Sequence, residues 1–197
     1  MDTSQSNANF GTSTQVRIDG SPVVTTYFKF NVTGITGTVT SATLRVYANS
    51  AQSLGYTAYK VVDTTWGETT ITAANAPALG SALGSSGKLT ANTWTSANVT
   101  AAIPGNGLYT IAISTTNSTA VSLSSREGAN PPQLVVNWSG SASAVPPIGN
   151  GSGDSTPPPV LVLLSVTLLA PSLVVLGRRQ DHRRFGPVGQ IGRPVGA

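Results

Sequence analysis

Cysteine is absent from this chain of 197 residues, and its one histidine, His182, lies near the C-terminus. A disulfide framework, a thiolate metal site and a cysteine nucleophile are therefore excluded. Residues 1–138 also contain no histidine, so serine–histidine catalysis and a histidine-bound zinc–water mechanism lack a member there. A pair of carboxylates, as in glycoside hydrolysis, is the remaining option. Asp63 and Glu68 flank Trp66, but as an acid/base pair they are a weak signal; we interpret Trp66 and Glu68 as structural and predict a noncatalytic protein.

Charged residues are scarce as well, at 9% of the chain. Residues 1–140 carry six basic and five acidic side chains, whereas the residues after them carry five arginines against two aspartates. Most of the formal net charge of +4 therefore lies near the C-terminus. A nucleic-acid footprint needs basic residues clustered on one face of a folded domain, so we expect no nucleic-acid partner.

Thr, Ser, Asn, Gly and β-branched apolar residues dominate the chain up to Gly140, in short segments separated by turn residues. No window in this part has the apolar period of a helix. Short strand-like segments at regular spacing are typical of an all-β sandwich. We predict about eight antiparallel strands in such a sandwich, at residues 14–19, 24–32, 42–48, 56–62, 94–99, 108–115, 120–124 and 133–138.

Alternation along these segments predicts which side chains face the core, because successive residues of a strand point to opposite faces of the sheet. Phe28, Phe30, Leu44 and Val46 are expected to pack between two sheets. In the fourth segment we take Thr57, Tyr59 and Val61 as the core side. The basic and tyrosine residues expected to face outward are then Arg17, Tyr27, Lys29, Arg45, Tyr47, Tyr56 and Lys60.

Composition changes sharply near residue 139, after a first domain at residues 1–138. Residues 139–159 are rich in Ser, Gly and Pro, which is typical of a flexible linker. Residues 160–176 carry no charge and reach the lower length limit of a membrane span. The basic residues after them would then be cytoplasmic and the domain outside the cell. Residues 177–197, rich in Gly, Pro and Arg, are expected to be disordered. The alternative, that this tail is not a selected sequence, stays open.

Seven segments between residues 7 and 134 resemble, in their order and spacing, a known family. They are residues 7–14, 16–22, 27–32, 41–47, 66–72, 75–77 and 124–134. Together they resemble the DNRLRE domain, also called carbohydrate-binding module family 96. The resemblance implies a jelly-roll sandwich with an accessory role in polysaccharide binding, and some members of the family bind alginate. It does not by itself fix the ligand.

The outward set gives this implied function a candidate surface. Carboxylates of an acidic polysaccharide would pair with the cations, and sugar rings would stack on the tyrosines. The alternative is a structural or adhesive spacer domain of a bacterial surface protein with no sugar ligand. The predicted sugar-binding residues are Arg17, Lys29, Arg45, Lys60, Tyr27, Tyr47 and Tyr56.

The motif residues and the acidic residues receive separate predictions. Trp66 is expected to fill core space, and Arg126 to bridge to a carboxylate or to loop carbonyls. A structural calcium ion is also predicted, because such modules often carry one on oxygen ligands. The motif residues assigned a structural role are Trp66, Glu68, Arg126 and Glu127, and the candidate calcium ligands are Asp19, Asp63 and Glu68.

We expect a monomeric, extracellular module, secreted or anchored at the cell surface. The residues after Met1 form neither the basic nor the apolar region of a signal peptide. Family sequences usually begin with an apolar strand, whereas only residues 1–4 precede the Asn-rich turn here. Either export is not needed, or the natural start of the chain lies upstream.

Overall fold

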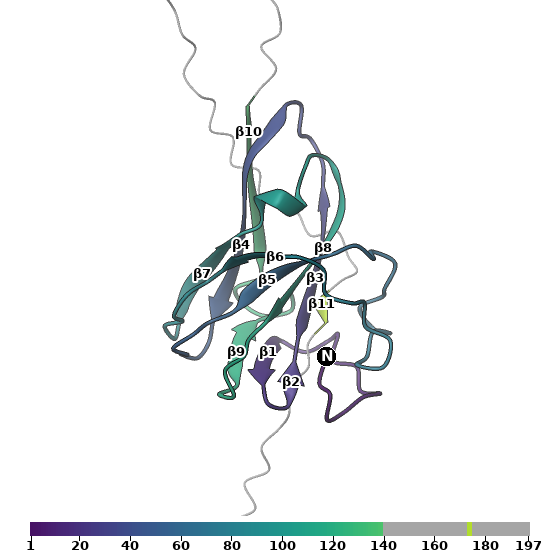
Figure 1. Ribbon diagram of the computed structural model, residues 1–197, viewed down its shortest axis with the longest axis vertical. Helices are drawn as coiled ribbons and strands as arrows, with labels where there is room; N and C mark the ends of the chain where they lie inside the picture. The colour runs from purple at the N-terminus through teal and green to yellow at the C-terminus, as the bar shows by residue number, and fades with distance from the viewer. Residues whose placement is uncertain (140–172, 175–197) are drawn as a thin grey trace, which may run out of the picture.

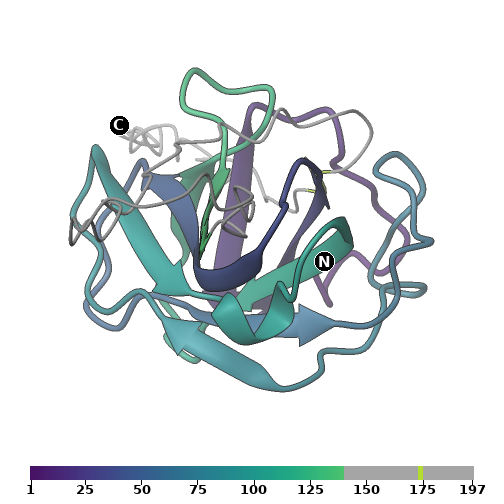
Figure 2. The ribbon, with the colours of Figure 1, turned by 90° about the horizontal axis from the view of Figure 1, so that it is seen from above.

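Two antiparallel sheets packed face to face form the molecule, whose computed structural model describes residues 1–139 and 173–174 (Figure 1; Figure 2). A single 3-10 turn, η1 (Thr100–Ala102), precedes β8. The first sheet contains β1 (Gln15–Gly20), β2 (Val23–Val24), β4 (Thr38–Ala48), β7 (Thr93–Asn98), β9 (Val121–Ser124) and β10 (Gln133–Ser139). The second contains β3 (Thr26–Val32), β5 (Thr57–Val61), β6 (Ala82–Ser85), β8 (Gly107–Ser114) and β11 (Leu173–Val174).

The predicted all-β sandwich is confirmed, and each of the eight expected segments contains a strand. Most ends differ from the prediction by one residue. The second segment is divided between β2 and β3, and β4 begins at Thr38, before its expected start. β6 was not predicted, because its four residues, Ala82–Ser85, have no alternating apolar pattern.

The predicted linker at 139–159, the apolar segment at 160–176 and the tail at 177–197 lie almost wholly outside the described residues. Ser139 ends β10, and β11 pairs with Tyr27 and Phe28 of β3. In the part of the chain that the structure describes, no helix is long and apolar enough to cross a membrane.

The main core lies between the two sheets, and the inward positions predicted for β3 and β4 are confirmed. Phe28, Phe30, Leu44 and Val46 each expose 1% or less of their surface and belong to one apolar cluster. Ile111 and Ile113 of β8 complete the same layer. Burial of these large apolar groups is the main stabilising term for a domain without disulfides.

A second apolar cluster covers the outer face of the second sheet. Tyr27, Val61 and Ala112 project from that face, and Trp66 and Ile71 of the β5–β6 connection pack against them. Phe10 of the N-terminal segment also contacts this cluster. The part of this outer face around Tyr27, Val61 and Ala112 is therefore buried beneath the N-terminal segment and the β5–β6 connection.

The predicted orientation of the fourth strand segment is wrong. Tyr56 and Ala58 belong to the main core, whereas Thr57 and Tyr59 are half-exposed and Val61 lies in the outer cluster. The physical reason is that β5 has apolar residues on both faces, because Ala58 packs in the main core while Val61 packs beneath the outer covering segments. Alternation identifies the core side only for a strand with one wet face.

β9 and β10 follow one another along the same side of β4. Ala48 pairs with both Thr93 of β7 and Leu123 of β9, and Arg45 pairs with both Ser96 of β7 and Gln133 of β10. Both β9 and β10 therefore lie opposite β7. Residues 125–132 form a loop out of the sheet between them, and this loop carries Arg126 and Glu127.

Candidate functional site

The outer face of the first sheet remains accessible along β4 and β7. Thr43, Arg45 and Tyr47 are half-exposed on β4, and Ser96 and Asn98 are exposed on β7. Their neighbours in sequence, such as Leu44 and Ala97, are buried in the main core. This face is therefore a wet sheet surface, in contrast to the covered face of the second sheet.

Two aromatic rings and a guanidinium group gather on this face, and we call Arg45, Tyr47 and Trp94 the aromatic patch. Tyr47 and Trp94 are cross-strand partners whose ring centroids lie 5.5 Å apart in an edge-to-face arrangement. The Arg45 guanidinium lies 4.8 Å from the centroid of the Trp94 ring and donates a 2.8 Å hydrogen bond to Oε1 of Gln133. Such contacts fix all three side chains in place.

Sequence reasoning named Arg45 and Tyr47 but missed Trp94. The signal was present, because Thr95, Ala97 and Val99 are the buried positions of that strand. Alternation alone would have placed Trp94 outward. The cross-strand register that brings it beside Tyr47 could not be read from the sequence.

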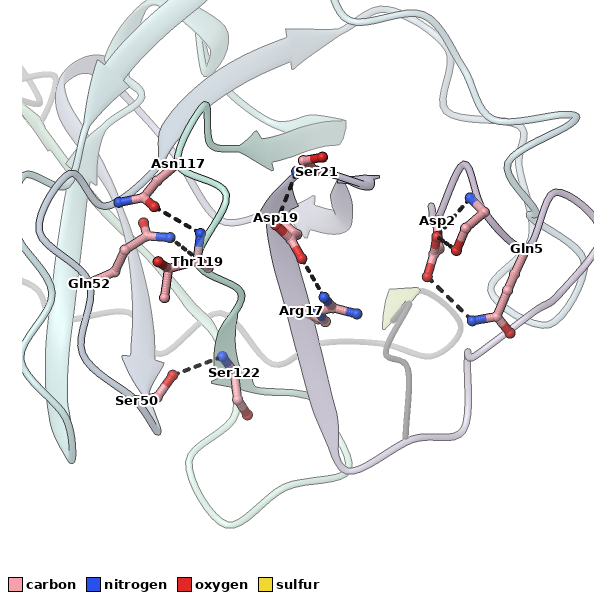
Figure 3. A network of polar contacts seen from close by, with 11 residues as sticks. Asp2, Gln5, Arg17, Asp19, Ser21, Ser50, Gln52, Asn117, Thr119 and Ser122 are labelled. Carbon is pink, nitrogen blue, oxygen red and sulfur yellow. Dashed lines mark hydrogen bonds and ion pairs between the residues drawn. The ribbon is translucent and has the colours of Figure 1, made fainter. Parts of the chain in front are cut away.

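A hollow of about 330 Å³, lined by more apolar than polar surface, opens at the end of the sandwich where β4 finishes and β7 begins. The Gln52 side chain is buried: its Nε2 donates to the carbonyl of Thr119, and its Oε1 accepts a hydrogen bond from Oγ1 of Thr115. Oδ1 of Asn117 accepts a 2.8 Å bond from the Thr119 amide (Figure 3). We call this the end hollow; its lining residues are Ala51, Gln52, Ser53, Lys88, Leu89, Asn117 and Thr119.

Tyr27 and Lys29, predicted as surface residues, lie on the expected outer face but beneath the covering segments. Tyr27 is fully buried, donates a 2.7 Å hydrogen bond to the carbonyl of Pro77, and has its pKa raised to about 12 by burial. The ammonium group of Lys29 donates to the carbonyl of Trp66 and lies 4.4 Å from the centroid of its ring. Burial lowers the pKa of Lys29, and the nearby charges of Asp63 and Glu68 partly oppose this shift. The prediction that Tyr27 faces solvent is wrong.

The remaining members of the predicted set are dispersed. Tyr56 is buried in the main core, so its predicted exposure is also wrong; its hydroxyl lies 3.0 Å from Oγ1 of Thr95, and burial raises its pKa to about 12. Arg17 forms an ion pair with the buried Asp19 (Figure 3). Lys60 is exposed on β5, on the other sheet from Arg45 and Tyr47. The seven residues therefore do not form one surface.

The motif residues join three distant segments. The Glu68 carboxylate is buried and forms an ion pair with Nη2 of Arg126, at 2.9 Å. Arg126 also donates hydrogen bonds from Nε and Nη2 to Oε1 of Glu127. Nδ2 of Asn9 donates to the carbonyl of Glu68. These contacts join the Asn-rich turn, the 66–71 segment and the 125–132 loop, and Trp66 of the middle segment packs in the outer cluster.

The three candidate calcium ligands have other partners. Asp19 binds Arg17 and the Ser21 amide, and Glu68 binds Arg126. Asp63 accepts hydrogen bonds from the amide and hydroxyl of Thr65, which lower the pKa of its carboxyl. Among the described residues, no group of three His, Cys, Asp or Glu side chains is placed to hold a metal ion, so these carboxylates form no shared ligand set.

Comparison with models of protein families identifies a match that covers both sheets. A sequence model described as carbohydrate-binding module family 96 matches residues 1–138, which is more than two thirds of the chain and includes both sheets apart from Ser139 and β11. No curated protein matches the chain.

Proposed function

Because this chain belongs to carbohydrate-binding module family 96, a family of noncatalytic modules, we propose that residues 1–138 bind a polysaccharide on the aromatic patch without cleaving it. The observation that carries the proposal is the Tyr47–Trp94 pair on the wet face of the first sheet, with Arg45 beside it. A sheet face with fixed aromatic rings offers an extended surface to a chain of sugar residues.

The chemistry of the patch suits a sugar chain. Aromatic rings provide apolar area for the C–H faces of pyranose rings at a small cost in side-chain entropy, since their rotamers are already fixed. Ser96 and Asn98 on β7 are exposed next to the rings and can exchange hydrogen bonds with sugar hydroxyls. The surface therefore combines apolar rings with hydrogen-bonding side chains, as a sugar chain combines C–H faces with hydroxyl groups.

Arg45 favours an acidic polysaccharide, such as an alginate-like polyuronate. In the described part of the chain Arg45 has no carboxylate partner, whereas Arg17 and Arg126 are both paired. A guanidinium group can bind a carboxylate with two parallel hydrogen bonds. We accordingly propose that a uronate carboxylate binds at Arg45, and that the module acts outside the cell, where such polymers occur.

The proposal is tested by affinity electrophoresis of the full chain in gels containing alginate or a neutral glucan. Trp94→Ala and Tyr47→Ala should each weaken alginate retention by roughly tenfold or more, since each removes a stacking ring. Arg45→Ala should weaken retention by alginate and leave neutral-glucan retention unchanged. The matched control is Lys60→Ala, which removes an exposed cation from the other sheet and should behave as wild type.

Unchanged retention of the Trp94 and Tyr47 variants would refute the patch as the binding surface. If wild-type protein is retained by neither polymer and is silent on an array of acidic and neutral glycans, the spacer function is favoured instead.

A further inference from the structure

The end hollow and the aromatic patch share two supporting strands, β4 and β7. The loop after β4 carries Gln52, and the connection before β7 carries Lys88. The Tyr47 hydroxyl donates a 2.9 Å hydrogen bond to the carbonyl of Asn92, whose amide in turn donates to the carbonyl of Ala48. The strands that present the rings therefore also adjoin two of the three connections that line the hollow, and the β8–β9 connection supplies the third.

The walls are fixed by a polar network. Gln52 and Leu89 exchange two backbone hydrogen bonds, of 3.1 and 2.8 Å. Nδ2 of Asn117 donates to Oγ of Ser53 on the opposite wall. The buried Gln52 amide is satisfied within the protein, so the floor is rigid before any ligand arrives.

Lys88 is the charged group of the hollow. Its side chain is exposed and has no carboxylate partner in the described part of the chain, and none of the lining residues is acidic. Ala51 is exposed and adds apolar area, whereas Leu89 is buried in the main core behind the hollow. Ser53, Asn117 and Thr119 provide hydroxyl and amide groups. The volume is near the lower end of the roughly 300–1,000 Å³ found for small-molecule sites, which suits a short ligand segment.

From these observations we infer that the end hollow is a second sugar subsite, in which Lys88 binds the carboxylate of an acidic sugar residue of a chain that also lies on the aromatic patch. This inference rests on the proposed function and extends it around the end of the sandwich. A long acidic oligosaccharide then contacts both subsites at once, and the second contact is effectively intramolecular. A short oligosaccharide reaches one subsite only.

The test is calorimetric titration of the full chain with alginate oligosaccharides of two lengths, a trimer and a much longer oligomer. Lys88→Ala should weaken binding of the long oligomer by roughly tenfold, because it removes one charge-assisted hydrogen bond. Binding of the trimer to the patch should stay nearly unchanged. Lys88→Glu should weaken long-oligomer binding further through repulsion, and Lys88→Arg should restore it. Lys60→Ala is again the matched control, and an unchanged melting temperature shows that the exposed Lys88 substitutions leave the fold intact.

The outcomes separate this inference from the proposed function. Loss of binding in Trp94→Ala with wild-type behaviour of all Lys88 variants would overturn the subsite and leave the patch standing. Equal losses for trimer and long oligomer in Lys88→Ala would overturn the extension, because the two regions would not be separate contacts. If the wild-type protein binds neither oligomer, the proposed function fails and the subsite fails with it.

Discussion

At the scale of single residues, the most consequential charge is the buried carboxylate of Glu68. Its side chain is 3% exposed, and the guanidinium group of Arg126 that pairs with it is 26% exposed. A buried ion pair adds little net stability by itself. Removing one partner is costly, however, because the remaining charge stays desolvated and loses the attraction of that partner. The pair therefore governs how the 125–132 loop is held against the 66–71 segment.

Arg126→Ala should lower the free energy of unfolding by about 3 kcal/mol, the lower end of the range for broken buried pairs, because Arg126 keeps some solvent contact. Urea unfolding followed by tryptophan fluorescence measures this. Glu127→Gln is the control: it removes the more exposed partner of the same arginine and should cost less than about 1 kcal/mol. Equal costs for the two variants would contradict the assigned role of Glu68.

At the scale of elements, the sequence predicts where the strands lie but not which segments cover their faces. Alternation placed Phe28 and Leu44 in the core, and it placed Tyr27 and Lys29 on the opposite face. It could not predict that the N-terminal segment and residues 62–81 would cover that face, because those contacts join residues far apart in sequence. Because this outer face is covered, Tyr27 is buried although alternation predicts that it faces solvent.

The candidate site was predictable to a similar extent. Alternation along one strand predicted that Arg45 and Tyr47 face outward. The same alternation along a second strand predicts an outward position for Trp94. Their proximity depends on the pairing register of β4 with β7, and the end hollow depends on three connections meeting at one end of the sandwich. Neither the register nor the loop packing leaves a local pattern in the sequence.

The loop after β4 meets the β6–β7 connection at Gly55, where there is no room for a side chain. A Cβ atom at Gly55 would lie 1.8 Å from the carbonyl oxygen of Gly87, and its φ of +73° also disfavours other residues. Gly55→Ala should therefore combine backbone strain of about 1–2 kcal/mol with an overpacking cost of about 1–3 kcal/mol. Thermal unfolding of the variant measures the sum.

Gly87→Ala is the matched control for this contact. Gly87 has a similar φ of +66°, but a Cβ atom there would meet nothing within 4 Å. Its substitution should cost only the backbone strain, about 1 kcal/mol. If the two alanine variants melt at the same temperature, the close approach of the two connections is not a feature of the folded protein.

At the scale of the whole molecule, each of the two apolar clusters contains a buried tyrosine. Tyr56 lies in the main core and Tyr27 in the outer cluster, and burial raises the pKa of each from 10.0 to about 12. The folded protein thus favours the neutral phenols, whereas the unfolded chain ionises near pH 10. Their stabilising contribution is complete below pH 10 and is lost as the pH rises to about 12.

The free energy of unfolding should therefore fall steeply over this interval, by on the order of 2–3 kcal/mol for each tyrosine, at about 1.4 kcal/mol per pKa unit. Urea midpoints measured at successive alkaline pH values, together with tyrosinate absorbance, follow the change.

Lys29 contributes with the opposite sign, because its pKa is lowered in the folded state and its burial penalty disappears on deprotonation. Tyr27→Phe and Tyr56→Phe isolate the phenols from this effect, and each should remove its own part of the alkaline slope. An alkaline slope that neither substitution changes would mean that neither cluster excludes water from its tyrosine.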